Sequence, residues 1–344
     1  MTNQRESIPV VVIPCPLCGS EEHRVLHPLR DYLYGFAGDF GVVRCRGCRH
    51  MYMNPRPADD SLLACYPTEY APHRSVAADS IAPAASIAPD SGSPPSRPLW
   101  RGVARRIPGL RPFLYRLGQE QATYLPSLPA GGSGRLLEIG CGNGRFLEQA
   151  AAQGWNVDGI EPGAEAAAAC QARGLRVQCC TLAEADLAAA SRQAIVLWMV
   201  LEHVPDPRQL LDKVWDTLSP DGVLALSVPN GGGFERRLFG KYWLGYEAPR
   251  HLQVFTAHSI ERLLREIGFE QIRIVHQANV RYWWGSLAAW GLEHVAHQRW
   301  PRRWLGYFLD EPPRSLHWLS LIPAKLLAVG RCGGRITVRA RKPA

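Results

Sequence analysis

A set of glycines after an apolar segment limits the fold of this 344-residue chain more than any other feature. Residues 135–139 have the apolar content of a buried strand, and Gly140, Gly142 and Gly144 follow at alternate positions. Glycines there permit a tight turn and let the backbone approach a ligand closely. A helix that starts next would present free N–H groups at the same place. The run therefore predicts a strand, a ligand-binding turn and a helix.

Short apolar runs alternate with helical patterns through the rest of the chain, which is typical of a doubly wound α/β sheet. We expect strands at 135–139, 156–160, 176–180, 194–199, 222–228, 271–277 and 335–340. We expect helices at 144–153, 164–173, 207–218 and 257–267, the last capped by Thr256. The prediction is a seven-stranded, Rossmann-like α/β sheet whose last two strands form a hairpin, interrupted by a helical insertion at about 281–334.

Two acidic residues narrow the choice of ligand. Glu138 lies two positions before Gly140, where it would repel the pyrophosphate of a dinucleotide but favour a ligand with an ammonium and a sulfonium group. Glu161 ends the second predicted strand, where a carboxylate can accept hydrogen bonds from both ribose hydroxyls. Together they predict S-adenosylmethionine.

Residues from about 134 to 277 resemble a class I S-adenosylmethionine-dependent methyltransferase of the small-molecule type. The stretch from Leu197 to Pro207 resembles that family's fourth-strand motif, whereas Thr181-Leu-Ala-Glu184 departs from the acid that many members use for adenine. The backbone at Leu182 is then expected to hold adenine. The resemblance implies a cofactor-binding set of Glu138, Gly140, Cys141, Gly142, Gly144, Glu161, Leu182 and Met199.

Two histidines are candidate catalytic residues. His203 follows the fourth predicted strand and His251 follows the fifth, so both should face the edge where the cofactor binds. Methyl transfer needs an aligned nucleophile and, for some acceptors, a base, which histidine provides near neutral pH. A divalent ion held by Glu202 and both histidines is a weaker alternative, because Met199 stands where a related motif has a further Glu.

Two Cys-x-x-Cys pairs mark an N-terminal module at 10–72. Cys15 and Cys18 form the first pair, and Cys45 and Cys48 form the second. Two such pairs are typical of a closed, tetrahedral Cys₄ zinc site with a structural role. The module resembles the N-terminal zinc ribbon of methyltransferases that act on sugars and other metabolites, although the acceptor of those enzymes cannot be carried over. Nucleic-acid binding by the ribbon ranks lower, because the module is not notably basic.

The remaining segments suggest partners rather than chemistry. Residues 73–98 have the Ala/Ser/Pro composition of a flexible linker before a methyltransferase domain at 99–344. Six Trp and several Arg lie at 283–327, a composition compatible with a lid, a homodimer contact, a peripheral membrane surface or ordinary packing. The ten cysteines, without a recognisable secretory signal or spanning segment, favour a cytoplasmic, possibly membrane-associated protein.

The sequence thus predicts an S-adenosylmethionine-dependent methyltransferase acting on a small-molecule or lipid-linked acceptor, such as a sugar or a quinone-like compound. A nucleic-acid methyltransferase is the main alternative, but no Asn/Asp-Pro-Pro-Tyr/Phe signature follows the fourth predicted strand. A non-catalytic protein that binds S-adenosylmethionine is the second alternative.

Overall fold

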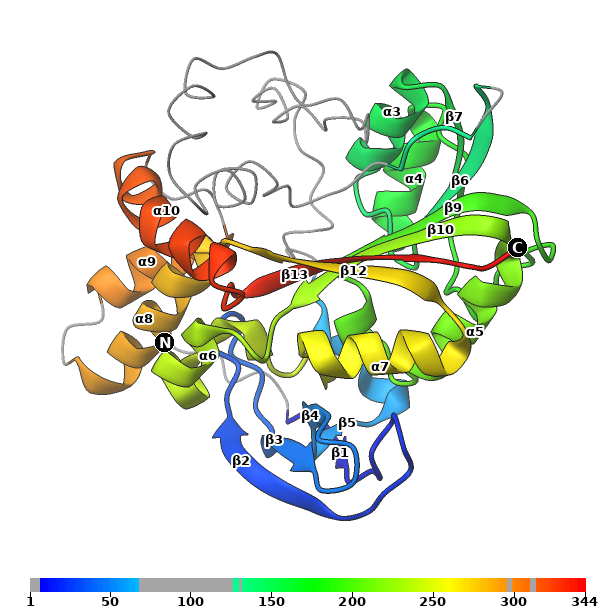
Figure 1. The fold of residues 1–344 in the computed structure, drawn as a ribbon. Coiled ribbons are helices and arrows are strands. Elements are labelled where there is room, and N and C mark those ends of the chain that lie inside the picture. Colours follow the sequence, from blue (N-terminus) through cyan, green and yellow to red (C-terminus); the bar gives the residue numbers. More distant parts are fainter. Residues whose placement is uncertain (1–6, 68–125, 130–131, 296–298, 310–313) are drawn as a thin grey trace, which may run out of the picture.

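A seven-stranded sheet forms the central layer of the molecule (Figure 1). The computed structural model describes residues 7–67, 126–129, 132–295, 299–309 and 314–344. The strand order is β12-β13-β10-β9-β6-β7-β8, and β13 runs antiparallel to both of its neighbours. The strands are β6 (Gly134–Ile139), β7 (Trp155–Ile160), β8 (Val177–Gln178), β9 (Arg192–Trp198), β10 (Leu218–Pro229), β12 (Glu270–Gln277) and β13 (Arg335–Arg341). The predicted doubly wound α/β fold is confirmed.

Helices cover both faces of this sheet because each presents one apolar stripe to it. On one face, α3 (Arg145–Ala152) and α4 (Ala164–Ala172) pack Leu147 and Cys170 against β6 and β9. On the other, α5 (Pro207–Thr217) and α7 (Ala257–Ile267) bury Leu211 and Leu263. Helix α7 begins where predicted, since the Thr256 hydroxyl accepts a hydrogen bond from Ser259 N at 3.1 Å.

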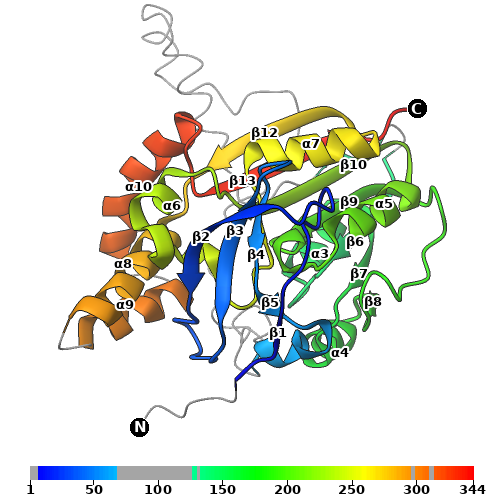
Figure 2. The same cartoon turned by 90° about the horizontal axis from the view of Figure 1, so that it is seen from below.

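The N-terminal module lies below the central sheet in Figure 1 and in front of it in Figure 2. Its elements are β1 (Val10–Val11), β2 (His23–Leu29), β3 (Phe40–Cys45), β4 (Met51–Met53), β5 (Arg56–Pro57) and the 3₁₀ turns η1 (Asp59–Ser61) and η2 (Leu63–Cys65). The four-stranded sheet has the order β11-β4-β3-β2, and β11 (Gln253–Val254) comes from the other half of the chain. The module therefore shares a sheet with residues 253–254, and no pattern in the sequence predicted this pairing.

The predicted insertion before the last strand is helical. It consists of α8 (Val280–His294), α9 (Arg299–Leu309) and α10 (Arg314–Val329). Together with α6 (Phe234–Phe239), η6 (Gly240–Tyr242) and η7 (Leu244–Tyr246), these helices lie at one end of the molecule (Figures 1 and 2). Tyr282 and Ala288 of α8 share a buried apolar cluster with Met51 and Met53 of β4, so the insertion packs on the module.

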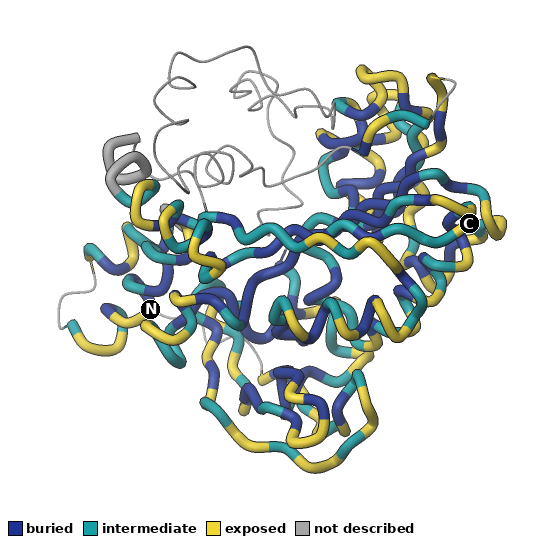
Figure 3. The backbone as a smooth tube through the Cα atoms, in the orientation of Figure 1, coloured by how far each residue is buried: buried dark blue, intermediate teal, exposed yellow. Residues whose placement is uncertain are grey.

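Buried residues lie along the central sheet and in the module below it (Figure 3), where they form separate apolar clusters. Within the described part of the chain, no helix has both the length and the apolar character needed to cross a membrane. The predicted linker at 73–98 lies outside the described residues, as does the start of the predicted methyltransferase domain at 99–125. Strand β8 is shorter than the strand predicted at 176–180. It lies at the edge of the sheet, and its ladder with β7 joins Val177 to Gly159 and Gln178 to Ile160.

Candidate functional site

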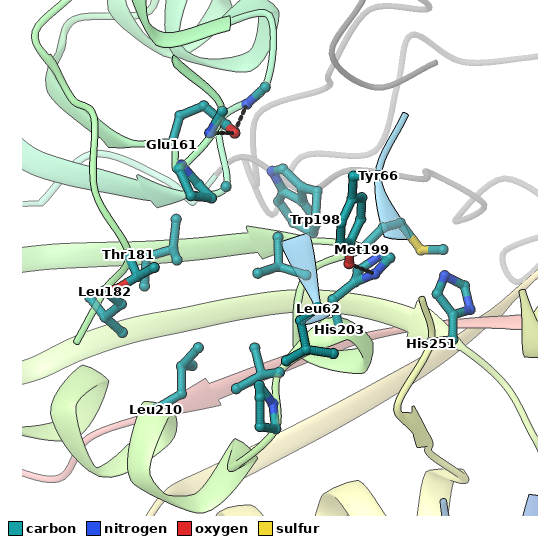
Figure 4. Close-up of a pocket in the computed structure, with 18 of the residues that line it drawn as sticks. Leu62, Tyr66, Glu161, Thr181, Leu182, Trp198, Met199, His203, Leu210 and His251 are labelled. Carbon is teal, nitrogen blue, oxygen red and sulfur yellow. Dashed lines mark hydrogen bonds between the residues drawn. The ribbon is translucent and has the colours of Figure 1, made fainter. Parts of the chain in front are cut away.

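A cavity of about 1080 Å³ opens at the carboxyl ends of the parallel strands (Figure 4). One side is lined by the ends of β6, β7 and β9, including Gly140, Glu161 and Trp198. The opposite side is lined by the N-terminal module, through Leu62 and Tyr66, and by the start of α8. The fold thus places the predicted nucleotide turn and the module's aromatic residues around one space.

The glycine turn has the backbone that its sequence predicts. Gly140, Gly142 and Gly144 have φ angles of 69°, 50° and 73°, which are in the left-handed region that favours glycine. A side chain at Gly140 would also lie 2.6 Å from Val200 Cγ2. Gly140 and Gly142 line the cavity, whereas Gly144 and the buried Cys141 lie behind it.

Glu161 closes the turn from the neighbouring strand. Its two carboxylate oxygens accept hydrogen bonds from Gly142 N and Gly163 N, each at 2.8 Å. The side chain is buried in the protein yet contacts the cavity, as a residue that accepts hydrogen bonds from a ribose must. The ribose contact of Glu161 stays a prediction, now placed at the cavity wall.

Glu138 occupies a different position from that expected of a direct ligand contact. It is buried behind the turn and does not line the cavity, and its Oε2 has no hydrogen-bond partner among the described residues. Burial, and then the negative charge of Glu161, raise the pKa of Glu138 well above its usual value. Its carboxyl group is therefore suited to a neutral or cation-paired state beneath the turn.

The expected adenine side of the cavity is apolar. Leu182 is buried and faces the cavity beside Thr181, whose N–H and hydroxyl group both donate to Glu184 at 2.8 Å. Glu184 therefore holds the backbone before Leu182 in place rather than contacting the cavity itself. Met199, which has a φ of 57°, lines the cavity between this side and the histidines.

His203 lies at the centre of the opposite half of the cavity (Figure 4). Its Nδ1 is 2.9 Å from the hydroxyl of Tyr66 and 3.2 Å from the carbonyl oxygen of Arg250. A carbonyl oxygen only accepts hydrogen bonds, so this contact favours a proton on Nδ1 and leaves the lone pair on Nε2. Burial, with the neighbouring His251, lowers the pKa of His203 to about 3, which keeps the imidazole neutral.

His251 packs edge-on against His203, with 4.6 Å between ring centroids. Its Nδ1 is 2.9 Å from the carbonyl oxygen of Gly245, and its Nε2 is 3.5 Å from Glu247 Oε2. Burial lowers the pKa of His251 to about 4. The structure therefore brings both predicted histidines together, with His251 more enclosed than His203.

A buried ion pair fixes this half of the site to the N-terminal module. Arg250 Nη1 and Nη2 donate to the two carboxylate oxygens of Asp31, each at 3.1 Å, and both side chains are fully buried. Arg250 Nε donates to Glu247 at 3.1 Å, and the guanidinium stacks 4.7 Å from the ring centre of Tyr34. The same Arg250 that offers its carbonyl oxygen to His203 is thus held by the module.

Glu202, His203 and His251 each place one candidate ligand atom within 4.8 Å of the others. Glu202 is fully buried, and neither of its carboxylate oxygens has a hydrogen-bond partner in the described structure. Burial raises the pKa of Glu202 well above its usual value, so a protonated carboxyl group is favoured. These three residues are the ones that the divalent-ion alternative names. Met199 adds no oxygen or nitrogen ligand to them.

The four cysteines of the two Cys-x-x-Cys pairs converge as predicted. Their Sγ atoms all lie within 4.8 Å of one another, and the Cys15–Cys48 and Cys18–Cys45 distances are 3.5 Å. These distances are close to the edge of a tetrahedron with Zn–S bonds of about 2.3 Å. None of the four forms a disulfide, and only Cys18 is exposed.

Sequence comparisons agree with the site. A family model described as "Methyltransferase domain" matches residues 106–274. A Mycolicibacterium smegmatis protein named "Probable S-adenosylmethionine-dependent methyltransferase" is 29% identical over 187 residues, which cover 53% of this chain and 69% of that protein. Residues 106–274 thus match a methyltransferase domain, and the chain is similar to a protein named as S-adenosylmethionine-dependent. The predicted enzyme class is thereby confirmed.

Other relatives share shorter regions. The ubiquinone biosynthesis O-methyltransferase of Erwinia tasmaniensis is 31% identical over 142 residues, which cover 38% of this chain and 56% of that enzyme. The chain thus spans little more than half the length of this relative. Among solved structures, Haemonchus contortus phosphoethanolamine N-methyltransferase 2, in complex with S-adenosyl-L-methionine, has 17% identity and a TM-score of 0.43. That match covers 68% of this chain and 53% of the other.

The residues that sequence reasoning missed come mainly from the N-terminal module of the methyltransferase. Tyr66 contacts His203 from 137 positions away, and Asp31 pairs with Arg250 from 219 positions away. Tyr66 stands in Tyr66-Pro-Thr-Glu-Tyr70, a segment similar to one in the N-terminal module of zinc-ribbon methyltransferases, and this similarity is a sequence signal for it. Asp31 has no such signal, because its role depends on a partner that only the fold reveals.

Proposed function

We propose that the protein transfers the methyl group of S-adenosylmethionine to a hydroxyl group of a small-molecule or lipid-linked acceptor. The observation that carries this proposal is the single cavity that joins the glycine turn and Glu161 to the Tyr66–His203 pair. S-adenosylmethionine supplies an electrophilic methyl group. The protein has then to hold the acceptor oxygen in line and accept its proton.

His203 is the proposed base. A proton on Nδ1, held by the Arg250 carbonyl oxygen, leaves Nε2 able to accept the proton of a hydroxyl group in the cavity. With the proton on Nδ1, that N–H is shared between the Arg250 carbonyl oxygen and the hydroxyl oxygen of Tyr66, and both oxygens act as acceptors. His251 narrows the site beside His203 and supports its neutral form, because two adjacent positive charges would repel each other.

The acceptor side has an apolar wall with a basic rim, which suits a ring-bearing acceptor. Leu33, Tyr34 and Leu62 supply apolar and aromatic surface, and Arg281 and Arg335 add positive charge on the far side. Several relatives are named ubiquinone biosynthesis O-methyltransferases, which favours a phenolic hydroxyl over a sugar as the first acceptor to try. The surroundings favour this over a nucleic acid, because apolar residues outnumber basic ones in the module's wall.

We also propose that Cys15, Cys18, Cys45 and Cys48 bind one structural zinc ion. Four thiolates complete a tetrahedral shell and leave no open position, so the ion would take no part in methyl transfer. Its role would be to hold the turns before β2 and after β3, and through them the β4–β11 pairing.

Incubation with methyl-labelled S-adenosylmethionine and a panel of phenols, sugar nucleotides and RNA tests the proposal. We expect label in a phenolic product, lost in His203→Asn while calorimetry still detects cofactor binding. His258→Asn, on the exposed side of α7, is the matched control and should keep full activity. Transfer that persists in His203→Asn, or label only in RNA, would refute the proposal.

A further inference from the structure

An exposed apolar surface lies on the helices at one end of the molecule. Among the described residues, Phe234 and Leu238 of α6 are 41% and 53% exposed, and Ile322 and Leu326 of α10 are 68% and 53% exposed. Trp290 of α8 is 40% exposed. Five of the nine large apolar side chains that the described structure leaves exposed are therefore on three neighbouring helices. Scattered single apolar residues need no explanation, but such a concentration does.

The same spacing occurs on two of these helices. On α6, Phe234 and Leu238 are separated by four positions, with Arg237 at the third. On α10, Ile322 and Leu326 have the same separation, with Lys325 at the third. Positions i, i+3 and i+4 share one face of a helix. Each helix thus presents a basic residue between two exposed apolar ones, and we call these two triplets, with Trp290, the helical face.

Contacts between the helices hold the two triplets in one rigid unit. Phe234 N donates to the carbonyl oxygen of Cys332, just after α10, at 2.9 Å. Trp283 of α8 stacks against Phe234, with 6.2 Å between ring centroids. Trp284, its neighbour, donates from Nε1 to Ser320 of α10 at 3.1 Å. The helical face is therefore part of the folded structure.

Positive charge predominates around this face. Residues 280–334 contain seven Lys and Arg but three acidic residues. One of those acids, Glu293, already holds Lys241, Tyr32 and Tyr242 through hydrogen bonds of 2.7–2.8 Å. On α6, Glu235 is buried, so that the exposed charge there is basic. The charge of the face thus complements an anionic surface.

We propose that the helical face docks on the surface of an anionic phospholipid bilayer. Leu238, Ile322 and Leu326 would enter the boundary of the acyl chains, and Arg237 and Lys325 would meet the phosphate groups. Nucleic-acid interfaces are polar and hydrated, so they would leave these aliphatic side chains without a partner. Attachment would be peripheral, in keeping with helices that do not span a membrane.

The placement of α8 links this docking to the acceptor. Its first turn contributes Arg281 and Tyr282 to the cavity. Its last turns carry Trp290, which belongs to the helical face. An acceptor with a lipid tail could therefore place its headgroup at His203 while its tail stays in the bilayer. This assignment of a lipid-linked acceptor rests on the proposed function, whereas the docking itself does not.

Vesicle sedimentation tests the docking with the full chain. The wild-type protein should sediment with vesicles of phosphatidylcholine and phosphatidylglycerol in equal parts, and far less with phosphatidylcholine alone. The double variants Leu238→Ser/Ile322→Ser and Arg237→Glu/Lys325→Glu should each weaken partitioning by at least about tenfold. Val12→Ser and Arg46→Glu, at exposed sites on the N-terminal module, are matched controls and should bind as the wild type does.

Binding that is equal on neutral vesicles, or unchanged in both double variants, would overturn the proposal. If the wild type does not bind vesicles but forms a dimer in sedimentation velocity, and these substitutions dissociate that dimer, the face would be assigned to a second copy of the chain instead. Methylation of a water-soluble acceptor separates the two proposals. The double variants should retain it, whereas His203→Asn should lose it and still bind vesicles.

Discussion

Asp31 and Arg250 form a fully buried, two-contact ion pair across 219 positions of the chain, with both hydrogen bonds at 3.1 Å. The pair joins the N-terminal module to the segment that carries His251 and supports His203. The position of the N-terminal module therefore affects the position of the residues around His203 and His251.

Asp31→Asn should destabilise the protein strongly, because it leaves the Arg250 guanidinium buried without its main counter-charge. We expect a loss of about 3–5 kcal/mol in the free energy of unfolding, measured by urea denaturation. Asp221→Asn, in an exposed pair with Arg341, is the control and should cost less than about 1 kcal/mol. Equal effects in the two variants would contradict a structural role for the buried pair.

The cofactor turn predicts a specific loss of affinity. Glu161→Ala removes the acceptor of Gly142 N and Gly163 N, and Gly140→Ala adds a methyl group against Val200. Each variant should weaken S-adenosylmethionine binding by at least about tenfold in calorimetry, since a lost charged hydrogen bond costs about 1.5–3 kcal/mol. Glu165→Ala, on the exposed first turn of α4, should leave affinity unchanged. Unaltered binding in both site variants would exclude the proposed cofactor contacts.

The pH dependence of methyl transfer follows from the lowered pKa of His203. A base acts in its neutral form, and a pKa near 3 keeps that form dominant as the pH falls through the usual histidine range. We therefore expect kcat/KM on a non-ionising acceptor to stay level between about pH 5 and pH 8. A fall centred near pH 6.5 in the wild type would show instead that His203 titrates normally. Tyr66→Phe itself should lower kcat by about tenfold, with KM for the cofactor unchanged.

Removal of metal should affect the acceptor side before the cofactor side. Elemental analysis is expected to find about one zinc per chain, lost in Cys45→Ser and retained in Cys179→Ser, whose thiol is exposed away from the cluster. After chelation, methyl transfer should fall while S-adenosylmethionine binding persists, because Leu62 and Tyr66 belong to the module and Glu161 does not. Simultaneous loss of both properties would argue against separate roles.

Local sequence determined the parts of the fold that could be predicted. The strands β6 and β7 are closed by Gly140 and Glu161, β9 is a short apolar run, and α7 has both its cap at Thr256 and its stop at Gly268. Each of these signals lies within a few residues of the element it defines. The Cys₄ cluster was predictable for a similar reason, because each pair sits on one turn.

Contacts between distant segments could not be predicted in this way. Nothing in residues 253–254 marks them as the fourth strand of the module's sheet, since two residues carry no measurable period. The pairing of Tyr66 with His203 likewise depends on how the segment after η2 lies relative to the turn that follows β9. The predicted roles of His203 and His251 thus remain predictions, now with a defined geometry to test.

The β4–β11 pairing has a consequence for synthesis of the chain. His50, at the start of β4, hydrogen-bonds the side chain of Gln253 from 203 positions away. A ribosome adding about 5–20 residues per second would release β4 some ten to forty seconds before Gln253. Throughout that interval the module has an open sheet edge and lacks the Arg250 partner of Asp31. The segment made first is therefore among the last to be completed, and a truncated chain ending before Gln253 would expose an edge able to pair with other chains.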